Sequence, residues 1–210
     1  MRILPAAALA LALVGTPGLG QESAPDPVPG VGVKPVSVAG FTKAWALPDV
    51  DFQRYARIVI LEPFVDFKKD WRRDHQRVSN ADMETMKQEL AALFLERFDE
   101  VLGNSGFEIT TDAGADVLVI RPALIDLDVN VPNAETAGPD KQYATSALTV
   151  TLYMELVDST SGRLQARVID RDRTTQNTLL ELASSVYNVA EARKLLNVWA
   201  GQLRDWLKGG

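Results

Sequence analysis

The sequence predicts an α/β (α+β) domain: a mixed sheet of four to five strands, including an antiparallel hairpin, with two helices on one face. Three patterns support this prediction. Segment 147–173 alternates apolar and polar residues on both sides of a turn. Short, continuously apolar runs indicate buried strands. Two longer segments repeat apolar residues every three or four positions, which is typical of helices packed on one side.

The hairpin is the clearest of these elements. Its even-numbered positions from Leu148 to Leu156 are apolar, whereas Tyr153 and Glu155 fall on the other side of an extended chain. Turn-forming residues follow at 158–162 and end in Gly162, which adopts positive φ easily. The alternation then resumes at Leu164. Because a lone hairpin is marginally stable, we expect the rest of the chain to cover its apolar face.

Two further segments predict strands inside the sheet. The run 57–61 is apolar on both faces and ends at Glu62-Pro63. A second run starts at Asp116 and continues to about 131, with a bend or bulge expected at Pro122. In its second half the alternation predicts that Ile125, Leu127 and Val129 face the core.

Two segments predict amphipathic helices. The first runs from about Asn80 to Leu102, after Ser79 and Asp82, whose spacing is that of a capping pair, and before Gly103, where a helix can end. The second follows Asn188, with Glu191 three residues later, and its apolar residues recur from Ala192 to Trp206. Both have a single apolar stripe, so we expect both on one face of the sheet.

The chain divides into three parts. Residues 1–20 contain a run of about twelve apolar residues followed by small ones, and this pattern predicts a secretory signal peptide. The run is shorter than the about 20 apolar residues that a helix needs to span a bilayer. Residues 21–44 are rich in Pro and Gly and read as an extended tether. Residues 45–208 form the single predicted domain. We expect the mature protein to be exported, periplasmic or associated with the cell envelope.

The composition of the chain argues against several kinds of partner and chemical site. The net charge of −6 gives no general attraction to nucleic acid or to anionic lipid. The chain has no Cys, so it offers no disulfide, no thiol nucleophile and no site for the N-terminal lipid of a lipoprotein. His75 is the only His, and it lies in a charged segment typical of a solvated loop. A catalytic or metal site built around it is therefore the weaker interpretation.

The segment from Lys68 to Arg77 is basic in an otherwise acidic chain. Aromatic residues interleave with its cations, and such a patch can contact phospholipid head groups or anionic glycans. The alternative is a solvated linker with Trp71 tucked against the domain. The candidate partner-contact residues are Lys68, Lys69, Trp71, Arg72, Arg73 and Arg77.

A second polar group lies in the predicted strand 116–131. Asp126, Asp128 and Asn130 could supply oxygen ligands to Ca²⁺, but the Gly and the distal Glu of a calcium loop are missing. A polar strand face explains the same residues more simply. Two carboxylates could also serve acid–base hydrolysis, although positions two apart lie closer than such chemistry needs.

Three stretches resemble a known family. They are Trp45 to Ile60, Gly114 to Val119 and the turn at Ser161-Gly162, and together they resemble the bacterial family catalogued as domain of unknown function 3313. The resemblance covers about 45–207 and implies an envelope protein, because members are typically envelope lipoproteins. It implies no catalytic residues. The missing cysteine departs from that lipoprotein pattern.

These observations predict a non-catalytic exported domain that binds or helps to assemble another envelope component. Its candidate contact surfaces are the outer side of the hairpin, segment 68–77 and the long connection 132–146. The alternative is a carboxylate-dependent hydrolase acting on cell-envelope material, centred on Asp126 and Asp128. A ligand carrier would require an internal cavity. We expect no cofactor, no metal and no transmembrane span in the mature chain.

Overall fold

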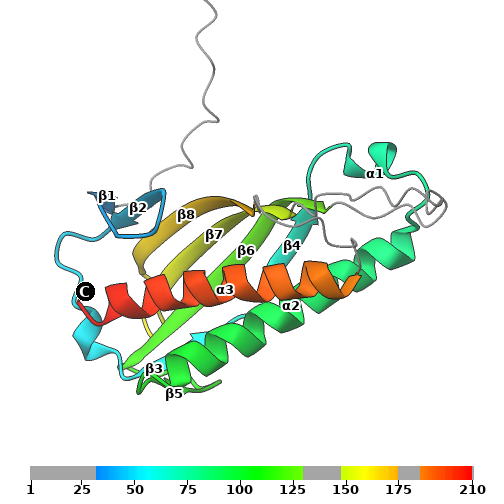
Figure 1. Ribbon diagram of the computed structural model, residues 1–210. Helices are drawn as coiled ribbons and strands as arrows, with labels where there is room; N and C mark the ends of the chain where they lie inside the picture. Colours follow the sequence, from blue (N-terminus) through cyan, green and yellow to red (C-terminus); the bar gives the residue numbers. More distant parts are fainter. Residues whose placement is uncertain (1–31, 130–147, 175–184, 210) are drawn as a thin grey trace, which may run out of the picture.

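One mixed sheet dominates the fold (Figure 1). The computed structural model describes residues 32–129, 148–174 and 185–209, and within them the sheet has eight strands and is accompanied by three α-helices. The elements in chain order are β1 (Lys34–Val36), β2 (Lys43–Ala46), the 3-10 turn η1 (Phe52–Arg54), β3 (Arg57–Ile60), β4 (Phe64–Phe67), α1 (Trp71–Asp74), α2 (Asn80–Gly103), β5 (Glu108–Ile109), β6 (Val117–Val129), β7 (Leu148–Asp158), β8 (Leu164–Thr174) and α3 (Ser185–Leu207).

Strand β6 organises the sheet because it pairs with three others. The spatial order is β1-β2-β8-β7-β6-β3-β5, and β4 also pairs with β6. Strands β3 and β4 lie one after the other along the same side of β6, parallel to it, whereas β7 lies antiparallel on its other side. The predicted strand 57–61 is thus confirmed as an internal strand, held between β5 and β6.

The predicted hairpin is confirmed as β7 and β8. They pair antiparallel with Met154 opposite Val168, and Gly162 in their turn has φ +67°. Asp158 organises this turn: its Oδ1 accepts hydrogen bonds from the backbone N–H of Ser161 at 2.8 Å and of Thr160 at 3.2 Å. The bond from the Ser161 backbone is the main cause of the lowered pKa of Asp158.

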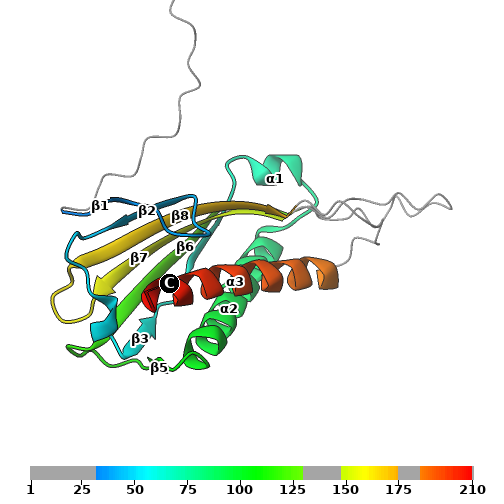
Figure 2. The same cartoon turned by 60° about the vertical axis from the view of Figure 1, so that its left-hand side comes forward.

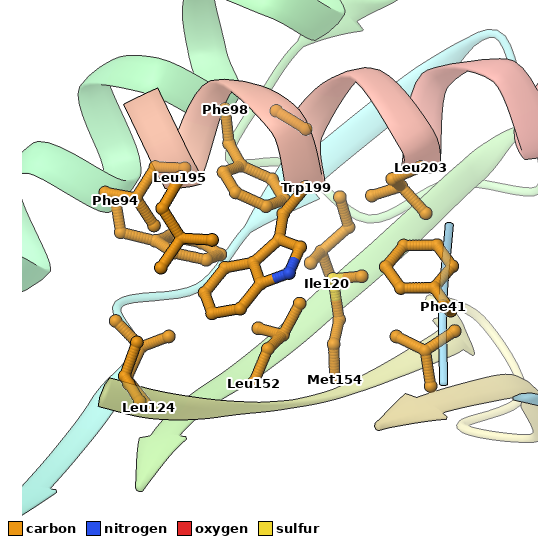
Figure 3. Close-up of a cluster of buried hydrophobic side chains, with 14 of the residues drawn as sticks. Phe41, Phe94, Phe98, Ile120, Leu124, Leu152, Met154, Leu195, Trp199 and Leu203 are labelled. Atoms are coloured by element: carbon orange, nitrogen blue, oxygen red, sulfur yellow. The ribbon is translucent and has the colours of Figure 1, made fainter. Parts of the chain in front are cut away.

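The two long helices lie on one face of the sheet (Figures 1 and 2). Helix α2 starts at the predicted capping box, in which the backbone N–H of Asp82 donates to Ser79 Oγ and that of Ser79 donates to the Asp82 carboxylate. Between helices and sheet lies an apolar core, shown in Figure 3 around Trp199, which is 1% exposed. The rings of Phe94 and Phe98, from α2, stack 3.9 Å apart above it.

The predicted numbers, four to five strands and two helices, are smaller than the numbers in the structure. Strands β1, β2 and β4 contain only three or four residues each, which is too short to display a period of two. Helix α1 is a single turn inside the charged segment. The second long helix also starts earlier than predicted, at Ser185 instead of after Asn188.

The boundary between tether and domain was also placed too late. Strand β1 and the first two residues of β2 fall inside 21–44, and both strands pair in the sheet. The domain therefore begins before residue 45. The predicted signal peptide, the tether up to 31, Asn130 and the connection 132–146 lie outside the described residues and remain predictions.

The irregularity of β6 lies beyond Pro122, which pairs in register with Met154. The register shifts between Ile125 and Asp128, where Asp126 has φ +55°. Ile125 lies ahead of this bulge and shares the face of its partner Thr151, away from the helices, so its predicted core position is wrong. The bulge then brings the odd-numbered residues that follow to the core side. Leu127 and Val129 are buried, as predicted.

Candidate functional site

Trp71 holds the basic segment between β4 and α2 to the domain. Its ring centroid lies 4.4 Å from that of Phe67 and 4.0 Å from that of His75. At 1% exposed, Trp71 presents no ring to a partner, which does not fit its predicted role in partner contact. Its buried Nε1 has no hydrogen-bond acceptor among the described residues, a cost of about 1–3 kcal/mol. The packing of the ring therefore outweighs that loss.

His75 completes this stack and has a local role. Its ring is nearly parallel to that of Trp71, with an interplanar angle of 12°. Its Nδ1 lies 2.8 Å from the backbone carbonyl oxygen of Trp71, so Nδ1–H is the donor in that contact. The same carbonyl accepts the backbone N–H of His75 at 3.1 Å. These contacts fix His75 as the end of α1.

The cations of the segment differ in how firmly neighbouring carboxylates hold them. Lys68 Nζ donates to Asp128 Oδ2 at 2.8 Å, and this hydrogen bond raises the pKa of Lys68. Arg73, whose side chain is 70% exposed, lies 3.5 Å from Asp74 Oδ1 and 3.6 Å from Asp70 Oδ2. Lys69, Arg72 and Arg77 are also exposed. The segment thus displays positive charge on a buried aromatic anchor.

The bulge separates the two carboxylates of the hydrolase hypothesis. Asp128 pairs with Lys68, as described above. Asp126 lies at the bulge itself, where its Oδ2 is 3.5 Å from Thr151 Oγ1. A paired carboxylate and an exposed one are typical of a polar strand face. Among the residues that the structure describes, no group of three or more His, Cys, Asp or Glu side chains could hold a metal ion.

A charged cluster that sequence reasoning did not identify lies at the centre of the sheet, on the face away from the helices. Glu155 Oε1 accepts hydrogen bonds from Arg167 Nη2 and from Tyr153 Oη, both at 2.8 Å, while Arg121 Nη1 lies 3.7 Å from Glu155 Oε2. The guanidinium of Arg167 also lies 5.4 Å from the ring centroid of Tyr153.

This cluster shifts two pKa values. Burial alone raises the pKa of Glu155, but the hydrogen bonds from Arg167 and Tyr153 outweigh it and the pKa falls. Burial, followed by the bond to Glu155, raises the pKa of Tyr153 to about 12. The period of two had placed Glu155 and Arg167 on the outer side. Their pairing depends on the hairpin register, which brings them opposite each other.

The described part of the chain has no helix long and apolar enough to cross a membrane. Its fold and charged surfaces define a layered α+β domain.

The family follows from sequence. The model of the family "Protein of unknown function (DUF3313)" matches residues 32–203, so the chain belongs to this family and the resemblance is confirmed. The comparison with curated proteins found no match.

Three solved structures are similar at low sequence identity. The PelC dodecamer from Paraburkholderia phytofirmans has 10% identity and a TM-score of 0.38, over 79% of this chain and 95% of that one. A minor lipoprotein from Acinetobacter baumannii has 12% identity and a TM-score of 0.38, over 74% and 94%. The hypothetical protein CT253 from Chlamydia trachomatis has 8% identity and a TM-score of 0.42, over 74% and 99%. Similarities this low carry no conclusion about the function of this chain.

Proposed function

We propose that this protein is an exported, non-catalytic domain that binds an anionic component of the cell envelope through the basic segment 68–77. The observation that carries the proposal is the arrangement around Trp71. A buried ring fixes the segment, and Lys69, Arg72 and Arg73 extend from it into solvent. A fixed backbone lowers the entropy lost when flexible cations bind a partner.

The absence of converging chemistry among the described residues supports a binding role. The single imidazole is stacked and hydrogen-bonded within its own turn. The most buried carboxylates, Asp158 and Asp170, accept hydrogen bonds from a turn and from core side chains. These groups serve the fold, so the exposed charges are left as the means of recognition.

The proposal is tested by co-sedimentation of the purified full-length chain with an isolated envelope fraction. Reversal of two exposed charges, Lys69→Glu with Arg72→Glu, should reduce the bound fraction by about tenfold or more, because like charges then face the anionic partner. The matched control is Arg193→Glu with Lys194→Glu, two exposed cations on α3, which should bind as the wild type does. Equal binding by both variants would refute the proposal.

The source of the anion is resolved by a second probe. Vesicles of phosphatidylcholine, with and without phosphatidylglycerol, separate lipid head groups from other envelope anions. Binding only to the vesicles that contain phosphatidylglycerol, lost in the double variant, assigns the partner to lipid. Binding to the envelope fraction without binding to either vesicle assigns it to a protein or glycan. Binding to neither preparation would contradict the proposal.

A further inference from the structure

The sheet has a second face, which we call the outer face, opposite α2 and α3. Within the described ranges, no helix packs on it (Figures 1 and 2). Phe64 on this face is 63% exposed, whereas the other side of the same strands is closed over by the helical layer. A sheet that is covered on one side only leaves the other side available for a partner.

The strand register determines the composition of the outer face, because residues directly opposite each other in neighbouring strands point to the same face. One row across the sheet contains Lys43, Ile169, Tyr153, Ala123 and Phe64. The next row contains Trp45, Arg167, Glu155 and Arg121.

Arg171 faces the same way, two residues beyond Ile169 in β8. The outer face therefore combines four cations with two carboxylates, that of Glu155 and, beside Thr151, that of Asp126. Arg121 is 57% exposed at its side chain, and Arg171 is also exposed. In a chain whose net charge is −6, this face is a local concentration of positive charge.

Helix α2 has the opposite character. It carries six acidic and two basic residues, a net charge of −4. Glu89, Glu96 and Asp99 are exposed and lie seven and three positions apart, so they form one stripe along the side of the helix away from its buried residues. Among the described residues, neither Glu89 nor Asp99 forms an ion pair. Their carboxylates are thus available to cations from outside.

The two surfaces also match in size. Helix α2, with 24 residues, is about 36 Å long. Strands β7 and β8, with 11 residues each, are about 37 Å long. The face formed by β2, β8, β7 and β6 measures roughly 600 Å², which approaches the about 800 Å² that each partner buries in a standard interface.

We propose that the partner of the outer face is a second copy of this chain, whose α2 lies along the face with Glu89 and Asp99 opposite Arg121 and Arg171. The contact is head to tail, because it joins two different surfaces. In such a pair one copy keeps a free outer face and the other a free α2, so assembly continues beyond a dimer to a ring or a filament. This inference goes beyond the proposed function and uses neither segment 68–77 nor its variants.

The test is the molar mass of the full-length chain, measured by light scattering after size exclusion. At low ionic strength the wild type should exceed the 23.0 kDa of one chain, and the excess should fall as salt screens the contact. Either of two reversals should raise the dissociation constant about a hundredfold: Arg121→Glu with Arg171→Glu on the sheet, or Glu89→Lys with Asp99→Lys on the helix. The control Arg193→Glu with Lys194→Glu should assemble as the wild type does.

Mixing the two reversed variants gives the sharpest result. Each variant alone has two surfaces of like charge, but in the mixture the positive sheet of one meets the negative helix of the other, and the negative sheet meets the positive helix. The mixture should therefore recover the mass that each variant loses. A monomeric wild type at every concentration, a wild-type mass that neither reversal lowers, or a mixture that stays monomeric would overturn the inference.

Discussion

Asp170 and Glu155 lie on neighbouring strands of one hairpin but on opposite faces of the sheet, and their surroundings differ. Asp170 faces the helices and accepts hydrogen bonds from Trp199 Nε1 at 2.8 Å and from the backbone N–H of Thr42 at 3.1 Å. Glu155 faces away from them and accepts from Arg167 and Tyr153. The first carboxylate joins three segments that are distant in sequence, whereas the second joins residues of three adjacent strands, β6, β7 and β8.

This difference shows how one hairpin serves two purposes. On the helix side, a buried carboxylate held by neutral donors ties α3 and the segment before β2 to the sheet. On the outer side, arginines neutralise the carboxylate and leave an excess of positive charge. We therefore expect stability to depend mainly on the inner face and recognition mainly on the outer charges. The following predictions test this division, from the largest expected effect to the smallest.

Truncation of Trp199 should have the largest effect on stability. Trp199→Ala removes the central ring of the core and should lower the free energy of unfolding by about 3–5 kcal/mol, as measured by urea denaturation. Trp199→Phe retains a ring but removes the donor to Asp170, so its loss should be smaller. A loss below that of the outer-face variants would contradict the division.

Removal of the inner carboxylate should come next. Asp170→Ala leaves the Trp199 Nε1–H and the Thr42 N–H without their acceptor, at a cost of about 2–3 kcal/mol. Urea denaturation of Asp170→Ala and of Asp170→Asn, which keeps one acceptor oxygen, provides the measurement. If Asp170→Ala is as stable as the wild type, the hydrogen bonds of Asp170 do not stabilise the packing of α3 and the segment before β2 on the sheet.

Removal of the outer carboxylate should cost less. Glu155→Gln weakens the bonds to Arg167 and Arg121, and a loss of about 1 kcal/mol is expected because the Glu155 side chain is 20% exposed and the Arg121 side chain 57% exposed. A double-mutant cycle with Arg167→Gln isolates the pairwise energy. A cost equal to that of Asp170→Ala would remove the contrast between the faces.

The pH dependence of stability should have a defined sign. The pKa values of Glu155 and Asp158 are both lowered in the folded state. Each carboxylate therefore contributes stability that is complete above its unfolded pKa, about 4 for these groups, and is lost as the pH falls through its folded pKa. The unfolding free energy should decrease on acidification in this window, and by less in Glu155→Gln. A decrease of the same size in that variant would count against the lowered pKa of Glu155.

The effect of Tyr153 on stability at alkaline pH should be the smallest. The pKa of Tyr153 is raised to about 12, while an unfolded tyrosine titrates near about 10. Stability from this phenol is complete below the unfolded pKa and is lost as the pH rises toward the folded one. The phenolate absorbance of Tyr153→Phe should equal that of the folded wild type up to about pH 11. It should fall below the wild-type absorbance, by one titrating group, only once the pH approaches about 12. Ionisation of Tyr153 near pH 10 would contradict its burial beside Glu155.

Much of the fold could be predicted from sequence, because some elements are specified by their own residues. The β7–β8 hairpin combines a long alternation with a glycine in the turn, and α2 combines a capping box with an apolar stripe. In contrast, β1 and β4 are too short for periodicity to be recognised, and they depend on the strands beside them. The bulge at Asp126 depends on how β6 meets two different neighbours, which no local pattern encodes.

The charged sites were predicted only in part. Segment 68–77 stands out in sequence because its cations lie close together along the chain. The Glu155 cluster does not, since its members come from β6, β7 and β8 and meet only once the register is set. Similarly, the burial of Trp71 follows from its stack with Phe67 and His75, whereas the sequence left open whether its ring contacts a partner or is tucked against the domain.

The central claim is that this domain acts by binding through segment 68–77. Photo-crosslinking in intact cells tests it most directly, with a photoreactive residue in place of Arg72 or, as the control, of Asn197 on the exposed side of α3. The account predicts a discrete crosslinked product at position 72 and none at position 197. Absence of a product at 72, or the same product at both positions, would contradict it.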